Sequence, residues 1–388
     1  MINFILKKSI PFLLLFSLFL SCTNDIPLDL NTGFVEQGSF KTIEKKVVAS
    51  RTVTDIVNTG RGVYLVAGDF DGIVSEVLIR SDSLQRVTDS IATAQLVLPV
   101  HQIVGTATGR RLFLERVVST TDTSWVETSI KWDSFSANYT SEQITEYVLP
   151  DTVGDAVNQD SMIIDIDLSV INGWRDNPAS NHGFLLRTQT PGYQLELHAR
   201  ESLDRRPFLR LVTVASDSTT DTLQVVFNAD VFIFERHTAL APDPLYLGNG
   251  EFHRIFVSFK VDSIPPIATI TRAQLEFNLD NSSSTWKTDI FPIAATLASY
   301  IEASDSLALD LDSGVLSTTA TPGDASFRLL VTSYVQNLVL SQKTDLGIAI
   351  IPNASQYNLA RITAYSDATD ASRAPRLKIE YTVPPGSE

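Results

Sequence analysis

Thiols, methionines and basic residues are scarce in this 388-residue chain. Cys22 is the only cysteine, which excludes an intramolecular disulfide framework and a metal site made of several cysteines. Lys and Arg total 30 against 45 Asp and Glu, which gives a formal net charge of -15. Nucleic acid is therefore not expected as a partner, because binding it depends on neutralising phosphate charge. Without covalent cross-links, the fold must be stabilised by packing.

Long apolar runs are absent beyond the N-terminus. There, Lys7 and Lys8 precede an apolar stretch over residues 10–20, and Ser21 supplies a small residue before Cys22. This pattern is typical of a secretory signal and not of a membrane span. A sole cysteine at the cleavage point resembles a relaxed bacterial lipobox. We therefore expect residues 1–22 to be a lipoprotein signal peptide and Cys22 to be diacylated, with the remainder exported to the cell envelope. An ordinary signal peptide with an incidental thiol, or an uncleaved anchor, would export the chain equally.

The exported part is dominated by short predicted strands. Residues 23–45 are interpreted as a tether that holds the body off the membrane. Beyond them, runs rich in Val, Ile, Thr and aromatic residues are separated by clusters of Asp, Ser, Thr, Gly and Pro, as at residues 74–79, 111–117 and 208–214. This rhythm favours strands over helices and predicts an all-β sandwich or barrel.

The second half of the chain repeats the first. Three pairs of matching positions keep their order: Tyr64 with Tyr246, residues 183–186 with 347–350, and Pro207 with Pro375. Their offset drifts, as it does when loops differ in length between two copies of one fold. We therefore divide the exported chain into a first domain over residues 46–216, a polar linker over residues 217–225 and a second domain over residues 226–384.

Each copy resembles the DNRLRE-type β-sandwich domain, which is close to carbohydrate-binding module family 96. Four marks of the first copy carry the resemblance: Tyr64-Leu65, residues 125–132 (WVETSIKW), residues 170–174 (VINGW) ahead of 181–184 (NHGF), and residues 206–209 (RPFL). The second copy matches at residues 229–231, 330–337 and 374–377, but it has Tyr300 in place of the first tryptophan motif. The resemblance implies two tandem jelly-roll-like antiparallel sandwiches that bind glycans or attach to cell surfaces, with a bound calcium in some relatives.

Candidate ligand contacts gather in the first copy. Trp125 and Glu127 belong to one motif, and an aromatic face can stack on a sugar ring. Arg187, Arg200 and Arg206 lie in an arginine-rich stretch, and guanidinium groups suit the carboxylates or sulfates of an acidic polysaccharide. Packing of the tryptophans in the core, and surface pairing of the arginines with neighbouring acids, would explain the same residues without a ligand.

Evidence for a metal or for catalysis is thinner. Asp230, beside the first strand of the second copy, is the expected calcium ligand because the resemblance places such sites there. The five histidines show no metal-binding spacing, and the sequence has no nucleophile elbow and no glycine loop for phosphate. We therefore expect no enzyme activity, although a carboxylate pair for glycoside hydrolysis would leave no sequence pattern.

These observations favour a non-catalytic exported lipoprotein. In the leading hypothesis its first domain binds polysaccharide at the cell envelope, while the second domain acts as a spacer or a weaker copy. The alternative is a structural or adhesive surface spacer that has no glycan site. In both, the membrane is a partner through the lipid anchor.

Lipidation predicts that Cys22→Ala releases the protein from membranes, because acyl chains on this residue would hold it there. Fractionation of cells that carry either form measures the effect. A variant that still sediments with membranes contradicts the lipid anchor.

Overall fold

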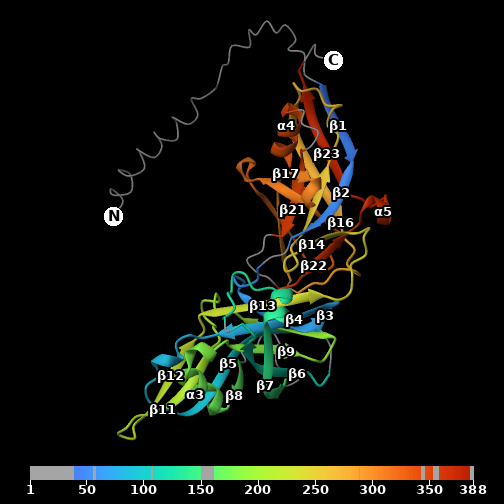
Figure 1. Cartoon of the computed structure of the whole chain (residues 1–388). Helices are drawn as coiled ribbons and strands as arrows, with labels where there is room; N and C mark the ends of the chain where they lie inside the picture. Colours follow the sequence, from blue (N-terminus) through green and yellow to red (C-terminus); the bar gives the residue numbers. More distant parts are fainter. Residues whose placement is uncertain are drawn as a thin grey trace, which may run out of the picture.

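A computed structural model describes residues 39–55, 58–105, 108–121, 123–149, 161–287, 289–341, 346–352 and 358–384. These residues form two lobes joined end to end, each made mainly of strands (Figure 1). Every pairing between the strands of a sheet is antiparallel, so the all-β prediction is confirmed. The signal peptide, Cys22 and most of the predicted tether lie outside the described residues. Within the described part, no helix is both long enough and apolar enough to cross a bilayer.

Lobe 1 is built from residues 58–236. Its strands are β3 (Tyr64–Phe70), β4 (Ile73–Arg80), β5 (Ser90–Gly105), β6 (Arg111–Ser119), β7 (Tyr139–Val148), β8 (Ser161–Asp165), β9 (Phe184–Thr188), β10 (Tyr193–His198), β11 (Phe208–Val214), β12 (Thr220–Val226) and β13 (Ala229–Arg236). Its helices are η1 (Leu84–Arg86), α2 (Trp132–Asn138), α3 (Leu168–Asp176) and η2 (Pro178–Ser180). One layer runs β12-β11-β5-β8, the other runs β13-β4-β9-β6-β7, and β10 and β3 connect β5 to β4.

Lobe 2 is built from residues 39–54 together with residues 245–383. Its strands are β1 (Ser39–Lys46), β2 (Ala49–Thr54), β14 (Leu245–Gly248), β15 (His253–Ser258), β16 (Thr269–Asn278), β17 (Phe291–Ile301), β18 (Ser306–Asp310), β19 (Leu316–Ala320), β20 (Ser326–Leu330), β21 (Leu346–Pro352), β22 (Arg361–Ala364) and β23 (Arg376–Val383). Its helices are η3 (Glu302–Ser304), η4 (Leu311–Ser313), α4 (Thr332–Ser341) and α5 (Asp367–Asp370). One layer runs β1-β23-β16-β20, and the other runs β2-β15-β21-β17 with β18 and β19 beyond it.

The two lobes share one pairing order. The layer β12-β11-β5-β8 corresponds to β1-β23-β16-β20, and β13-β4-β9-β6 corresponds to β2-β15-β21-β17. The pairs β10-β3 and β22-β14 also correspond, as do helices α3 and α4, which follow β8 and β20. Tyr64 lies in β3 and Tyr246 in β14, while Pro207 and Pro375 each precede the strand that pairs with β5 or β16. The repeat therefore extends to the pairing of individual strands.

The leading hairpins of the two repeats are exchanged between the lobes. Strands β1 and β2 precede lobe 1 in the sequence, yet they pair with β23 and β15 of lobe 2. Strands β12 and β13, which open the second repeat, pair instead with β11 and β4 of lobe 1. The predicted linker over residues 217–225 is thus mostly strand β12, and the chain passes between the lobes after Arg236. The predicted domain boundaries assumed that each unit is one contiguous stretch of sequence. The hydrogen bonds between strands instead build each lobe from segments of both repeats.

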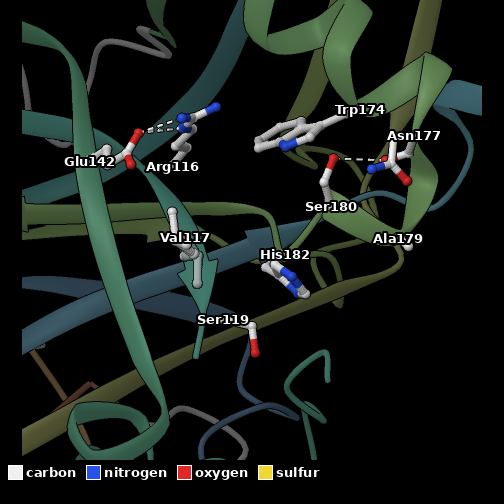
Figure 2. Close-up of a pocket in the computed structure, with 10 residues that line it drawn as sticks. Arg116, Val117, Ser119, Glu142, Trp174, Asn177, Ala179, Ser180 and His182 are labelled. Atoms are coloured by element: carbon white, nitrogen blue, oxygen red, sulfur yellow. Dashed lines mark hydrogen bonds and ion pairs between the residues drawn. The ribbon is translucent and has the colours of Figure 1, made fainter. Parts of the chain in front are cut away.

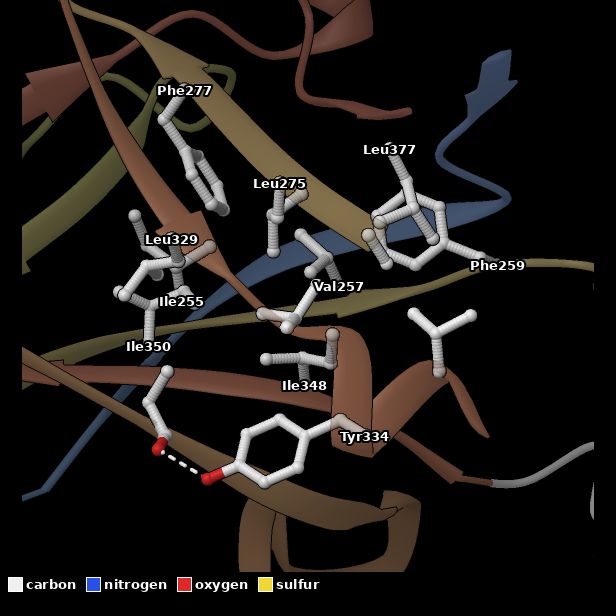
Figure 3. Packing of buried hydrophobic residues seen from close by; sticks show 14 of the residues in the cluster. Ile255, Val257, Phe259, Leu275, Phe277, Leu329, Tyr334, Ile348, Ile350 and Leu377 are labelled. Atoms are coloured by element: carbon white, nitrogen blue, oxygen red, sulfur yellow. Dashed lines mark hydrogen bonds between the residues drawn. The ribbon is translucent and has the colours of Figure 1, made fainter. Parts of the chain in front are cut away.

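Alternating side chains explain the strands that form the core of lobe 2. In β23, Leu377, Ile379 and Tyr381 are buried while the residues between them are more exposed, so one face of the strand is apolar. Figure 3 shows Leu275 and Leu377 on one side of the core facing Val257 and Ile348 on the other. The hydroxyl of Tyr334, on helix α4, donates to the carbonyl oxygen of Ala295 at 2.9 Å, which satisfies a buried polar group.

Two segments of the family resemblance contain helices. Within the motif of residues 125–132, residues 127–129 form a turn and Trp132 begins helix α2, so Ile130 and Trp132 are not alternate residues of one strand. Residues 332–337, part of the family match of the second copy, lie in α4, four of whose apolar residues are buried. In α4, burial of one apolar face overrides the strand preference of its valines and threonine.

The exchange predicts which engineered disulfide will form in a Cys22→Ala background. Ala49 of β2 lies opposite Ser258 of lobe 2. In the first repeat, the position that corresponds to Ser258 is Arg80, which lies opposite Ala229. Facing residues of antiparallel strands have the Cα spacing that a disulfide needs. We expect Ala49→Cys with Ser258→Cys to oxidise readily and Ala49→Cys with Arg80→Cys to stay reduced, as measured by thiol labelling. The reverse result would place β2 on lobe 1.

Candidate functional site

Three of the residues singled out from the sequence, Glu127, Arg200 and Asp230, meet in one cluster of lobe 1. Arg200 Nη2 lies 3.1 Å from Glu127 Oε1 and 2.7 Å from Glu201 Oε1. The backbone N–H of Arg200 donates to Asp230 Oδ2 at 2.6 Å, and its Nη1 donates to the carbonyl oxygen of Asn228 at 2.8 Å. This arginine therefore links the loop after β6, the turn after β10 and the start of β13. We call Glu127, Arg200, Glu201 and Asp230 the carboxylate cluster.

Asp230 is the buried member of the carboxylate cluster. Its side chain is 1% exposed, and Oδ1 has no hydrogen-bond partner among the described residues. Burial, reinforced by the neighbouring Glu201 and Glu127, raises the pKa of this carboxyl to about 8 against the lowering effect of the backbone N–H and the guanidinium of Arg200. The carboxyl is thus held largely neutral near pH 7.

The oxygens of the carboxylate cluster could also take a hard cation. Glu127, Glu201 and Asp230 each offer one oxygen, and these atoms lie within 4.8 Å of one another. Calcium is bound through such oxygens, so these three residues would hold it. Arg200, however, already supplies a positive charge to two of them, and a cation would have to be accommodated beside it.

Trp125 offers no face to a ligand. The indole is 2% exposed, and Nε1 donates to the carbonyl oxygen of His182 at 2.7 Å. Its ring packs in a core cluster with Phe135 and Ile130, and the guanidinium of Arg80 lies 5.1 Å from the ring centroid. This corrects the expectation that Trp125 stacks on a sugar, because both faces of its ring are buried in the core.

The arginines expected to form one anionic groove are engaged separately. Arg187 lies 3.3 Å from Glu76 and 3.4 Å from Glu115, both of which are largely buried. Arg206 is exposed and donates through Nε to the carbonyl oxygen of Ser202 at 3.2 Å. Arg187 and Arg200 are therefore each occupied by two acids, which leaves Arg206 as the exposed cation of the predicted set. The structure corrects the predicted groove for this reason.

Lobe 1 also has a hollow of about 370 Å³. Figure 2 shows the residues that line it. Arg116 and Glu142 close one side of it through an ion pair that is well exposed to solvent. Trp174 and His182 line the opposite side, but they are only 4% and 6% exposed. Because little aromatic surface is accessible, this hollow is a polar groove and not a stacking platform.

One serine and histidine pair has the spacing of a nucleophile and its base but not the electrostatics. Ser202 Oγ lies 3.0 Å from His198 Nδ1. The other ring nitrogen, Nε2, faces Arg205 at 3.5 Å, where a catalytic base needs an acceptor. Burial, His101 and Arg205 together lower the pKa of His198 to about 4, so the imidazole is a weak base.

The sequence interpretation missed the polar contacts at the lobe junction. Gln102 of lobe 1 donates to the backbone carbonyl of Lys287 in lobe 2 at 2.6 Å, and Lys287 Nζ donates to Gln194 Oε1 at 2.6 Å. Arg361 of lobe 2 pairs with Asp71 of lobe 1 at 2.8 Å. These residues lie far apart in the sequence and form no recognisable motif. Only the docking of the lobes brings them into contact.

Comparison with known proteins identifies no family. No family model and no curated protein matches the chain. Among solved structures, the chain is similar to the Streptococcus agalactiae AgI/II polypeptide BspA C terminal domain, with 10% identity, a TM-score of 0.18, and coverage of 86% of this chain and 90% of that chain. It is also similar to the C-terminal domain of the Streptococcus pyogenes antigen I/II-family protein AspA, with 8% identity, a TM-score of 0.15, and coverage of 87% and 91%. Scores this low mean that the backbones do not superpose, so no functional argument follows from them.

The state of Asp230 can be tested by the pH dependence of stability. An acid that ionises near pH 4 when unfolded but near pH 8 when folded lowers the free energy of unfolding as the pH rises through that window, by up to about 1.4 kcal/mol per pH unit. Asp230→Asn cannot ionise, so its stability should fall less than that of the native protein. Urea unfolding at several pH values measures the difference.

Added calcium tests whether the same carboxyl binds a metal, with the native protein and Asp230→Asn again compared. If the carboxylate cluster binds calcium through an ionised Asp230, millimolar calcium will stabilise the native protein near pH 8 and leave Asp230→Asn unchanged. That result would assign a calcium site to the carboxylate cluster, and no effect of calcium on either protein would exclude one.

Proposed function

We propose that this protein is a non-catalytic adhesive spacer displayed on the cell envelope, anchored through Cys22 and carrying lobe 1 as its outer end. The proposal rests chiefly on the path of the chain. Ser39, the first described residue, lies opposite Val383 in the β1 and β23 pair, so the chain enters lobe 2 at the end where it also leaves (Figure 1). A tether that precedes Ser39 therefore connects directly to lobe 2, and lobe 1 lies beyond it.

The exchanged hairpins suit a spacer that carries load. Strands β1 and β2 make two full sets of backbone hydrogen bonds to lobe 2, so tension on the tether reaches lobe 2 before it reaches lobe 1. Strand β13 holds lobe 1 through the eight residue pairs that join it to β4. Both lobes thus contribute strands to a continuous unit that needs no disulfide.

A non-catalytic role agrees with the side chains described above. The pair of His198 and Ser202 faces a cation, and the glutamates of the carboxylate cluster are paired with Arg200. We propose in addition that each lobe is a DNRLRE-type sandwich with jelly-roll connections, because the two lobes repeat one pairing order.

The exchange also provides a matched control for the adhesive role. Lobe 2 consists of residues 39–54 and 245–383, and Tyr246 N–H donates to Thr52 Oγ1 at 2.9 Å, so these two segments meet. Replacing residues 58–240 with a short glycine-serine linker should leave lobe 2 folded on the same anchor. We expect cells that display the full chain to aggregate and to attach to polysaccharide-coated surfaces more than cells that display lobe 2 alone.

Adhesion is compared at equal surface amounts, measured by labelling of intact cells. Equal attachment by the two forms would mean that lobe 1 does not contribute to adhesion. Attachment of the full-chain cells at the level of cells without the protein would exclude the adhesive proposal.

A further inference from the structure

We propose that the outer face of the layer β12-β11-β5-β8 in lobe 1 binds the same face of a second copy of this chain. Strands β8, β11 and β12 lie in the part of lobe 1 that is away from lobe 2 (Figure 1). At the cell surface the proposal names a partner for the adhesive role, and there it rests on that role. Association of the purified protein does not depend on it.

One row of apolar side chains crosses this face. Four residues stand in register on the four strands: Val226, Phe208, Val97 and Ile163. Each of them is adjacent in its strand to a residue of the lobe 1 core. Because the side chains of a strand point alternately to its two faces, these four point outward. We call them the apolar row.

The apolar row leaves hydrophobic surface in contact with solvent. Val226 is 54% exposed, Ile163 is 43% exposed, and Phe208 is partly buried. Val97 lies between Phe208 and Ile163 and is 3% exposed, so the accessible surface comes from the other three. Among the described elements, those that pack extensively against β8, β11 and β12 are strands of this same layer. The described part of the chain therefore leaves this surface open to a partner.

Lobe 2 shows that the fold does not require apolar residues in this row. The corresponding register row of the layer β1-β23-β16-β20 consists of Lys46, Arg376, Glu276 and Arg328. Arg328 lies 2.7 Å from Glu276, and both side chains are well solvated. Arg376 pairs with Glu44 at 2.7 Å. Exposed apolar residues in one row of lobe 1, where lobe 2 has charges, are typical of a surface that binds a partner.

The next row of the face supplies one positive and one negative charge. Arg210 on β11 and Asp165 on β8 stand on either side of Gln95 on β5. Gln95 Nε2 donates to Asp165 Oδ1 at 2.8 Å, and Arg210 Nη1 donates to Gln95 Oε1 at 3.4 Å. Asp165 is exposed and Arg210 is partly exposed. The glutamine thus holds two opposite charges on the same open face, one on each side of β5.

A two-fold axis along β5 makes this face self-complementary. Such an axis lies between the two packed sheets and places β11 of one copy over β8 of the other. Phe208 then meets Ile163 of the second copy, and Arg210 meets Asp165 of the second copy. Both contacts occur twice, because the two copies use the same surface. The match of apolar with apolar and of positive with negative side chains favours a second copy over another partner.

The size of the face makes this a weak contact. Four strands about 4.8 Å apart and four rows about 6.8 Å apart cover about 400 Å² on each copy. Two copies would bury about 800 Å² together, whereas stable interfaces bury about 1,200 to 2,000 Å². The net charge of -15 also opposes the approach of two copies, but about 0.15 M salt screens this repulsion beyond about 8 Å. Many copies on one cell surface strengthen a weak pairwise contact by multivalency.

Self-association of the full chain with Cys22→Ala tests the proposal. Sedimentation equilibrium in about 0.15 M salt, at up to about 1 mM protein, should show monomers in equilibrium with dimers. Ile163→Arg with Val226→Lys gives lobe 1 the residue types that lobe 2 has at the corresponding positions. Both sites are exposed, so this variant should fold, and it should weaken the dimer by at least about 10-fold.

Phe40→Lys with Leu330→Arg is the matched control. Both residues lie on the outer face of the corresponding layer of lobe 2, where they are 62% and 60% exposed. This variant also replaces two exposed apolar residues by cations, and it should dimerise as the native protein does. Thermal unfolding shows whether each variant is folded. A native chain that stays monomeric at about 1 mM overturns the proposal, as does a dimer that Ile163→Arg with Val226→Lys leaves unchanged.

Charge reversal tests the two-fold arrangement itself. Arg210→Asp alone would bring carboxylates together in the dimer, and Asp165→Arg alone would bring guanidinium groups together. Each variant should therefore dimerise about 10-fold more weakly than the native protein, or worse. A mixture of the two variants should restore the dimer, because each reversed side chain then meets an opposite charge on the other variant. A mixture that associates no better than its components overturns the arrangement.

Mixed cells separate this proposal from the adhesive role. Aggregates of cells that display the full chain should exclude labelled cells without it, and Ile163→Arg with Val226→Lys should prevent aggregation. Adhesion that this variant retains would support the adhesive role and overturn self-association as its cause. Loss of aggregation in this variant, with a native protein that is monomeric in solution, would overturn the second copy and assign the face to another partner. Dimers in solution without any adhesion would retain the contact surface and exclude the adhesive role.

Discussion

Backbone pairing of the exchanged hairpins is the constraint on which the rest of the structure depends. The strands that open each repeat are hydrogen-bonded to the other lobe, β1 and β2 to lobe 2 and β12 and β13 to lobe 1. Edge strands left unpaired invite association with other chains, and here each lobe covers the acceptor edges of its sheets with strands from the other repeat. The lobes are consequently two units in packing but one unit in connectivity.

This connectivity sets the geometry of the junction. The crossing chain brings the β3–β4 turn of lobe 1 against β22 of lobe 2, where Asp71 meets Arg361. Glu196 is fully buried nearby, and Gln102 donates to its carboxylate at 2.8 Å. Burial raises the pKa of Glu196 and lowers that of Lys287, so both charges are weakened in a region that water does not reach. Polar contacts of this kind specify the docking more than they stabilise it.

The carboxylate cluster follows from the same exchange. Asp230 opens β13, a strand of the second repeat, yet it accepts the backbone N–H of Arg200 from the first. A residue interpreted from its own repeat as a site in the second domain therefore lies in lobe 1. Its neighbours Glu127 and Arg200, predicted to contact a ligand, contact each other instead.

The sequence by itself determined the all-β class, the strand rhythm and the presence of two repeats, because alternation and turn residues are local properties. Only the tertiary structure decided that Trp125 is buried, that Arg187 and Arg200 are neutralised, and that β1 and β2 belong to lobe 2. Matching hairpins fit either lobe equally well by pattern. Which lobe each joins depends on contacts between residues about 200 positions apart, as between Thr54 and His253, and no local pattern encodes such contacts.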